Sequence, residues 1–198
     1  MSQRPARPTA AAAPPAPAVA PPHVVLVGLM GAGKTTVGER LADALGVPFV
    51  DGDAALTALT GRDAATIAAV DGVPALVALE ARVLLDALAA PGPSVIAAAA
   101  SVVDDPSCRR ALRGPNVAVV RLRARPGTLA ARHGAGSHRR PLGPDLVAAF
   151  AAQSRARASR LAAVCPLVTI DVDAAAVDQV VAESLRAVRG GADGGPGV

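Results

Sequence analysis

The segment that most constrains this chain is residues 28–35, which read GLMGAGKT. It fits the pattern GxxxxGK[ST] and lies between a short β-branched run, residues 24–27, and a stretch with helical spacing, residues 34–45. In such a segment the glycines let the backbone curl until successive N–H groups point at one anion, and the start of the following helix adds partial positive charge. The segment therefore predicts a loop that binds the phosphates of a nucleotide.

The side chains of this loop have predicted tasks. Lys34 is expected to reach the β- and γ-phosphates of ATP as a catalytic residue, and Thr35 to offer its hydroxyl to Mg²⁺. Lys34 is the only lysine among 20 basic residues. In a sequence that otherwise uses arginine, a retained lysine indicates a need for a compact ammonium on a flexible stem, although chance survival gives the same pattern. Further contacts with the nucleotide are expected from Gly28, Met30, Gly31, Ala32, Gly33 and Thr36.

Two carboxylates, Asp51 and Asp53, follow the next predicted strand, residues 47–50. Ligands of parallel α/β sheets bind at the carboxyl ends of the strands, so both acids are expected beside the phosphate loop. There one acid would support the Mg²⁺ shell, and the other would orient an acceptor hydroxyl or take its proton. The alternative is a simple turn at the strand end, in which Asp53 caps the next helix.

Strand and helix patterns alternate along most of the chain. Alternation of this kind implies right-handed crossovers and a parallel sheet. The predicted fold is therefore an α/β P-loop NTPase three-layer sandwich, with a central parallel sheet of about five strands flanked by helices. The predicted strands cover residues 24–27, 47–50, 94–98, 117–122 and 167–171, and the predicted helices cover residues 34–45, 54–70, 74–90, 106–113, 126–132, 144–164 and 174–189.

A single P-loop domain is expected over residues 23–189. A chain of 198 residues is long enough for one α/β domain with a substantial core and short for two. The Pro- and Ala-rich residues 1–22 are expected to be disordered, and the Gly-rich residues 190–198 to be a flexible tail. Residues 133–143, rich in Gly, His, Arg and Pro, are expected to form a mobile lid.

Composition narrows the partners. With no Trp or Tyr and only two Phe, the chain has almost no side chains on which nucleic-acid bases could stack. Its formal charge of +4 comes from scattered basic residues, which suit a phosphate-bearing small molecule. The two cysteines lack metal or disulfide spacing, and no apolar run suggests a membrane span. We expect a cytoplasmic monomer that acts on a small-molecule hydroxyl acceptor, with no nucleic-acid or membrane partner.

With these residues in hand, the chain resembles shikimate kinases, small members of the nucleoside-monophosphate-kinase-like P-loop group. The resemblance runs from about residue 24 to residue 189 and rests first on GLMGAGKTT followed by VGERLADALGVPFVDGD. It continues with Thr60-Gly61-Arg62, with Asp71-Gly72, and with a helix that carries Glu80. It implies transfer of the γ-phosphoryl group of ATP to a hydroxyl of shikimate or a similar polyol acid.

The resemblance also implies roles for individual residues. Asp51 would support Mg²⁺, and Asp53 would contact the hydroxyl to be phosphorylated. Arg132 would pack on adenine, and Arg155 would bind the carboxylate of the acceptor. Arg140, in the segment RPL at residues 140–142, would move over the phosphates and contact the substrate as a catalytic lid residue. Each arginine has an ordinary alternative as a solvated charge on a loop or helix.

Two departures from the family lie in the acceptor half. The family usually has an Arg at about the position of Val77, and a Gly triplet where this chain has Ala97–Ala100. Alanine disfavours the positive φ angles that glycine allows, and a missing charged contact would remove about 2–5 kcal/mol of acceptor binding. Three alternatives therefore remain: a shikimate kinase or close relative, a kinase of the same fold for another acceptor such as gluconate, or a nucleotide-binding module without catalysis.

Overall fold

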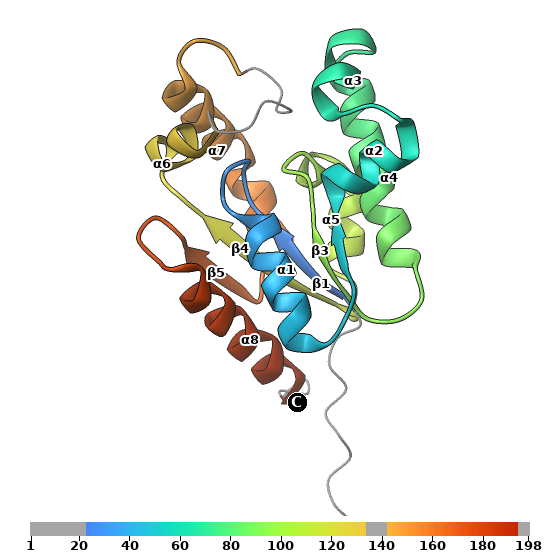
Figure 1. Ribbon diagram of the computed structural model, residues 1–198, viewed down its shortest axis with the longest axis vertical. Coiled ribbons are helices and arrows are strands. Elements are labelled where there is room, and N and C mark those ends of the chain that lie inside the picture. Colours follow the sequence, from blue (N-terminus) through green and yellow to red (C-terminus); the bar gives the residue numbers. More distant parts are fainter. Residues whose placement is uncertain (1–22, 134–141, 194–198) are drawn as a thin grey trace, which may run out of the picture.

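The computed structural model describes residues 23–133 and 142–193 and shows one parallel sheet between helices (Figure 1). The strands lie in the order β2-β3-β1-β4-β5, and every pair of neighbours is parallel. The predicted fold class is confirmed. Residues 1–22 and most of the expected lid lie outside the described residues. The strands are β1 (His23–Val27), β2 (Phe49–Asp51), β3 (Ser94–Ala97), β4 (Val117–Arg123) and β5 (Val168–Asp171).

The central strand β1 is buried along its whole length, as a strand covered on both faces should be. Because successive side chains of a strand point to opposite faces, Val24 and Leu26 pack on one side, with α1 and α8, and Val25 and Val27 on the other, with α4 and α5. The helices are α1 (Lys34–Leu45), α2 (Gly52–Thr60), α3 (Ala64–Val70), α4 (Val73–Ala89), α5 (Pro106–Leu112), α6 (Pro126–His133), α7 (Leu146–Ala163) and α8 (Val177–Asp193).

Several element boundaries differ from the predicted ones. The single helix expected over residues 54–70 is two helices, because Gly61, at a φ of 70°, ends α2, and the side chain of Asp63 caps α3. A 3₁₀ helix, η1 (Val102–Asp104), was not predicted. Helix α8 continues to Asp193, so the expected flexible tail begins with helical residues. Within the described residues, no helix is both long and apolar enough to cross a membrane.

Candidate active site

The phosphate loop joins β1 to α1 through backbone conformations that require glycine. Gly28 has a φ of 154°, and a Cβ atom there would lie 2.4 Å from the carbonyl oxygen of Leu122 in β4. Gly33, at the N-cap of α1, has a φ of 88°. The first N–H groups of a helix have no partner within it, so the start of α1 forms an anion site that opens onto the pocket lined by Gly33, Lys34 and Thr35.

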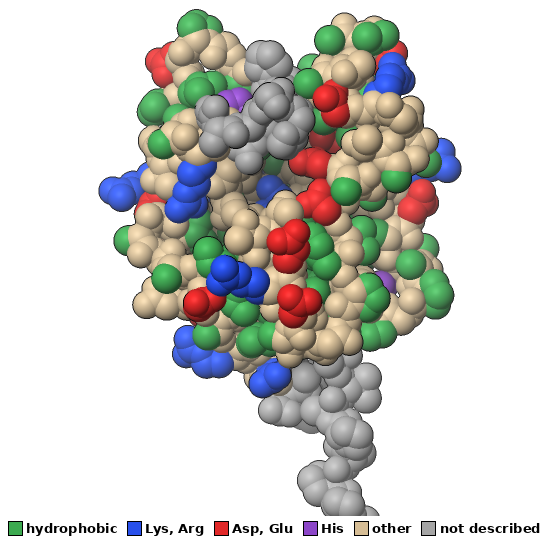
Figure 2. Space-filling model, in the orientation of Figure 1, with side chains coloured by type: hydrophobic (Ala, Val, Ile, Leu, Met, Phe, Trp, Pro, Cys, Tyr) green, Lys and Arg blue, Asp and Glu red, His purple; other side chains and the backbone are tan. Residues whose placement is uncertain are grey.

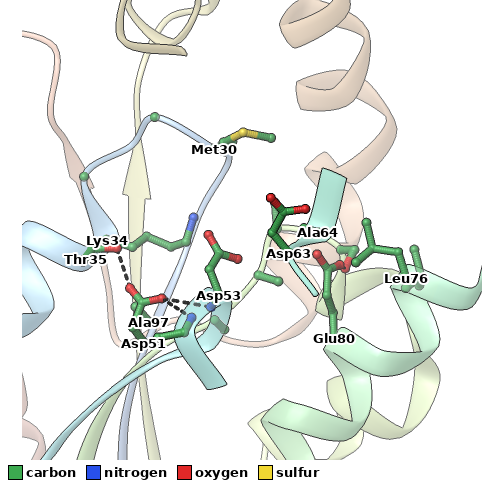
Figure 3. Close-up of a pocket in the computed structure, with 18 of the residues that line it drawn as sticks. Met30, Lys34, Thr35, Asp51, Asp53, Asp63, Ala64, Leu76, Glu80 and Ala97 are labelled. Carbon is green, nitrogen blue, oxygen red and sulfur yellow. Dashed lines mark hydrogen bonds between the residues drawn. The ribbon is translucent and has the colours of Figure 1, made fainter. Parts of the chain in front are cut away.

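Lys34 lies against the loop that it is predicted to serve. Its ammonium donates to the carbonyl oxygens of Gly28, at 3.0 Å, and Leu29, at 3.3 Å. In Figure 3 its side chain extends along the inner side of the loop. A flexible lysine can exchange carbonyl oxygens for phosphate oxygens while the backbone stays in place. The geometry therefore fits the expected contact between Lys34 and nucleotide phosphates.

Asp51 connects the loop to α2. The hydroxyl of Thr35 donates to Oδ2 of Asp51 at 2.7 Å, while Oδ1 accepts from the backbone N–H groups of Asp53, at 2.9 Å, and Ala54, at 3.1 Å (Figure 3). Asp51 is thus the N-cap of α2. The alternative in which Asp53 caps this helix is wrong, because Asp53 lies inside α2 and gives the cap only its N–H group.

A pocket of about 620 Å³ runs from the phosphate loop to α2, α3 and α4. Figure 2 shows a hollow with acidic side chains along one side. We call the part formed by the loop, Thr36, Asp51 and Arg132 the phosphate end. The distal end is formed by the remaining lining residues, which are Asp53, Ala54, Thr57, Asp63, Ala64, Val73, Leu76, Val77, Glu80, Ala97–Ser101, Gln153 and Arg157.

Asp53 stands where the two ends of the pocket meet. Its carboxylate points into the pocket, between the ammonium of Lys34 and the carboxylate of Asp63 (Figure 3). The side chain is exposed and lines the pocket. A carboxylate in this position can accept a hydrogen bond from a hydroxyl that approaches the phosphate end from the distal end.

The distal end combines an apolar wall with the carboxylate of Glu80. Val73, Leu76 and Val77 lie along one face of α4, and Glu80 follows one turn later on the same face. The hydroxyl of Ser101, just after β3, donates to Oε2 of Glu80. Val77 and Ala97–Ala100, the two departures seen in the sequence, therefore both lie in the pocket rather than elsewhere in the fold.

The arginine that reaches the distal end is Arg157, not Arg155. Arg157 lines the pocket and donates through Nε and Nη2 to Oδ2 of Asp104, at 2.9 and 2.7 Å. Arg155 is exposed and does not line the pocket. The reason is helical periodicity: residue 157 lies about 20° around α7 from the buried Phe150, whereas residue 155 lies about 140° away. The expected contact of Arg155 with an acceptor stays a prediction, and among the described residues Arg157 is the arginine of α7 that lines the pocket.

Of the other two arginines predicted to line the site, the structure describes Arg132 and does not describe Arg140. Arg132, in the last turn of α6, lines the phosphate end and donates to the carbonyl oxygens of Gly31, at 3.5 Å, and Val172, at 3.0 Å. It therefore ties the loop to the segment after β5. Arg140 lies outside the described residues, and its predicted catalytic role stays a prediction.

Arg62 and Asp71, two residues on which the resemblance to shikimate kinases rests, form an ion pair beside the pocket. Nη2 of Arg62 lies 2.6 Å from Oδ2 of Asp71, and the hydrogen bond and charge of Asp71 raise the pKa of Arg62. This ion pair joins the residue after α2 to the end of α3, so it closes the segment that carries Asp63 and Ala64 into the pocket. Its role is to hold the wall, and neither partner lines the pocket.

Known proteins of similar sequence indicate the family of this chain. The sequence model of the family described as shikimate kinase matches residues 30–189. The chain belongs to the shikimate kinase family. A shikimate kinase from Symbiobacterium thermophilum is 41% identical over 167 residues, which cover 83% of this chain and 94% of that protein. A shikimate kinase from Mycobacterium tuberculosis is 40% identical over 139 residues, which cover 69% of this chain and 77% of that protein.

The fold agrees with that assignment. A solved structure of shikimate kinase from Acinetobacter baumannii, in complex with shikimate, superposes with a TM-score of 0.79 at 25% identity, covering 86% of this chain and 94% of that one. As a member of the shikimate kinase family, the chain is an ATP-dependent kinase whose acceptor group is a hydroxyl. Asp51 and Asp53 lie beside the phosphate loop, as the sequence led us to expect, whereas the sequence singled out neither Arg157 nor Ser101 nor Asp104.

Proposed function

We propose that this shikimate kinase family member transfers the γ-phosphoryl group of ATP to a hydroxyl of shikimate or a closely related polyol acid. The observation that carries the proposal is that one pocket is lined by Lys34, the start of α1 and Arg157, and that the carboxylate of Asp53 points into it beside Lys34. One pocket can therefore hold a nucleotide phosphate and an acceptor hydroxyl side by side. The proposal includes the cytoplasmic location and monomeric state expected from the sequence.

The phosphate end has the donors that Mg²⁺ needs. The hydroxyl oxygen of Thr35 and Oδ2 of Asp51 are hard oxygen ligands that lie 2.7 Å apart, beside the start of α1. Thr35 would hold the ion directly, and Asp51 would hold its water shell. When bound, Mg²⁺ neutralises charge on the β- and γ-phosphates.

The chain's own residues would supply positioning and charge. N–H groups at the start of α1 and the ammonium of Lys34 would bind the transferred group, and their positive charge favours the transition state in which negative charge spreads over its oxygens. Asp53 would orient the acceptor hydroxyl in line and take its proton as the new bond forms. Arg132 would pack against the base, and Arg140 would cover the phosphates.

The distal end would select the acceptor. Val73, Leu76 and Val77 offer an apolar surface to one face of a ring, while Arg157 and Glu80 offer hydrogen-bonding groups at its edge. Arg157 would take the role first expected of Arg155. This mixture of a few polar groups with an apolar wall is typical of pockets for small hydroxylated molecules.

A coupled ADP-release assay with Mg·ATP tests the proposal. Shikimate, gluconate and a no-acceptor control are compared, with Lys34→Ala as the matched inactive variant. We expect ADP release that depends on shikimate and disappears in the variant, whose far-ultraviolet circular dichroism stays unchanged.

The other outcomes would indicate either a different acceptor or a protein without kinase activity. Stimulation by gluconate alone would replace the acceptor while keeping the kinase. No stimulation by either compound, together with tight ATP binding by calorimetry, would contradict the proposal and favour a nucleotide-binding module.

A further inference from the structure

The guanidinium of Arg157 is already engaged by protein groups. Nε and Nη2 donate to Oδ2 of Asp104, and Nη1 donates to Oε1 of Gln153 at 2.9 Å. A guanidinium has five N–H donors, so these three contacts leave at most two for a ligand. The side chain of Arg157 is 16% exposed and that of Asp104 is 24% exposed, so solvent screens this pair only weakly.

Asp104 is held in place from its other side. Its Oδ1 accepts from Nη1 of Arg160 at 2.9 Å, so one carboxylate joins η1 to two arginines of α7. Arg160 is about half exposed and does not line the pocket. It therefore anchors Asp104 and adds no cation to the pocket wall.

Among the described residues, the wall that α4 forms supplies no second cation to the pocket. Helix α4 turns a stripe of Val73, Leu76 and Val77 into the pocket, and the stripe ends in the carboxylate of Glu80. An acceptor carboxylate in this part of the pocket would share the charge of Arg157 with Asp104 and would bind through the donors that Asp104 and Gln153 leave. It would also gain no charged contact from the described residues of α4.

We infer that Asp104 is a specificity-determining residue, because its charge weakens the attraction between Arg157 and an acceptor carboxylate. The pocket therefore accepts a neutral polyol ring about as readily as the corresponding carboxylic acid. The acceptor is then selected by its hydroxyls, through Asp53 and the remaining donors of Arg157, and by the apolar face that packs on α4. This inference rests on the proposed function, because it concerns the acceptor of that same reaction. Asp104 acts through Arg157 and is a positioning residue.

The experiment compares two acceptors that differ only in charge. Values of kcat/KM are measured for shikimate and for its methyl ester, in the wild type, in Asp104→Asn and in Asp105→Asn. The last variant is a matched control: it removes the same charge one residue away, and asparagine can still cap α5 as Asp105 does. A ratio between two acceptors does not depend on how much of each preparation is folded.

We expect the wild type to use the two acceptors within about tenfold of each other, and Asp104→Asn to raise the acid-to-ester ratio by about tenfold. Asp105→Asn should keep the wild-type ratio, and the KM for ATP should be the same in all three proteins. A wild type that prefers the acid by about a hundredfold, or a ratio unmoved by Asp104→Asn, would overturn the inference.

Calorimetry separates this inference from the proposed function. Binding of shikimate and of the methyl ester is measured in the presence of Mg·ADP, without turnover. If neither compound is phosphorylated but both bind with similar affinity, and Asp104→Asn tightens only the acid, the proposed reaction fails and the inference stands. If neither compound binds, or only the acid binds to the wild type, the inference fails.

Discussion

Asp51 and Asp53 lie two residues apart and have different surroundings. Asp51 uses one oxygen for the hydroxyl of Thr35 and the other for two N–H groups of α2. The carboxylate of Asp53 instead faces the pocket beside Lys34. Removing Asp51 would therefore damage both the helix and the predicted magnesium site, whereas Asp53 can be changed with little effect on structure.

Asp53→Asn should lower kcat by about 100-fold or more, the usual contribution of a general base, because asparagine cannot take the proton of the acceptor. The KM for ATP should change by less than about threefold, because the phosphate loop and Lys34, which are expected to bind the nucleotide, are unchanged in this variant. Steady-state kinetics with both substrates varied gives the two numbers. An equal loss in kcat and in ATP affinity would contradict the role assigned to Asp53.

Arg157→Gln and Arg155→Gln form a matched pair on one helix. Arg157→Gln should raise the KM for the acceptor about tenfold, because a charged hydrogen-bond donor leaves the pocket. Arg155→Gln should leave that KM within about twofold, because changes of exposed side chains away from a site have small effects. Acceptor titrations at saturating Mg·ATP measure both. A larger effect of Arg155→Gln would restore the original expectation for that residue.

At the scale of elements, the sequence predicted which segments are helical or extended better than where they end. Gly61 and Asp63 divide the helix expected over residues 54–70. A glycine is a common signal for the end of a helix and an aspartate for its start, but the continuous apolar pattern favoured a single helix. The sequence could also have predicted which face of α7 Arg157 occupies, because Phe150, Arg157 and Leu161 fall on one side of a helix. The 3₁₀ turn at η1 carried no periodic signal, so Asp104 had no predicted partner.

The contact between α2 and β3 leaves no room for a side chain at Gly52. A Cβ atom there would lie 2.8 Å from the backbone carbonyl oxygen of Ala97. Gly52→Ala should therefore lower the free energy of unfolding by about 1–3 kcal/mol and shift Asp51 and Asp53, which flank it. Urea denaturation measures the loss. The control is Gly127→Ala in α6, where nothing lies within 4 Å and alanine should be neutral or stabilising; equal effects of both variants would refute the argument.

Helix α5 buries a thiol against α4. Burial, reinforced by the charge of Asp105, raises the pKa of Cys108 from its ordinary value of 9.0 to about 12. The native state then keeps a proton that the unfolded state loses, so this contribution to stability is complete below pH 9.0 and is lost as pH rises toward 12. Cys165 is exposed.

Thiol labelling at pH 8 should therefore modify only Cys165 in the native protein, and both cysteines in denaturant. Ellman's reagent counts the reactive thiols in each condition. Two thiols that react at the same rate in the native protein would show that α5 does not shield Cys108.

At the scale of the whole molecule, alternating strand and helix patterns and one phosphate loop were enough to predict the parallel sheet, and they also indicate the end where ligands are expected to bind. Both signals are local in sequence. The distal end of the pocket is assembled from α2, α3, α4, the segment from Ala97 to Ser101, and α7. Its charge balance depends on contacts such as that of Arg157 with Asp104, which lie 53 residues apart. No local pattern reports such a contact.

Nucleotide binding should stabilise the entire domain. At about 100 times its dissociation constant, Mg·ADP should add about 2.7 kcal/mol to the free energy of unfolding and raise Tm by roughly 5–10 °C. Differential scanning fluorimetry measures the shift. Lys34→Ala should reduce it, and chelation of Mg²⁺ should do so in the wild type. A shift equal in all three samples would show that ADP binds away from the phosphate loop.

The most direct measurement is phosphorus NMR of a reaction containing the protein, Mg·ATP and shikimate. We expect a new phosphomonoester signal that grows as the γ-phosphate signal of ATP declines, in equal amounts, and that is absent with Asp53→Asn over the same time. Release of inorganic phosphate alone, or an unchanged ATP spectrum, would contradict transfer to an acceptor hydroxyl.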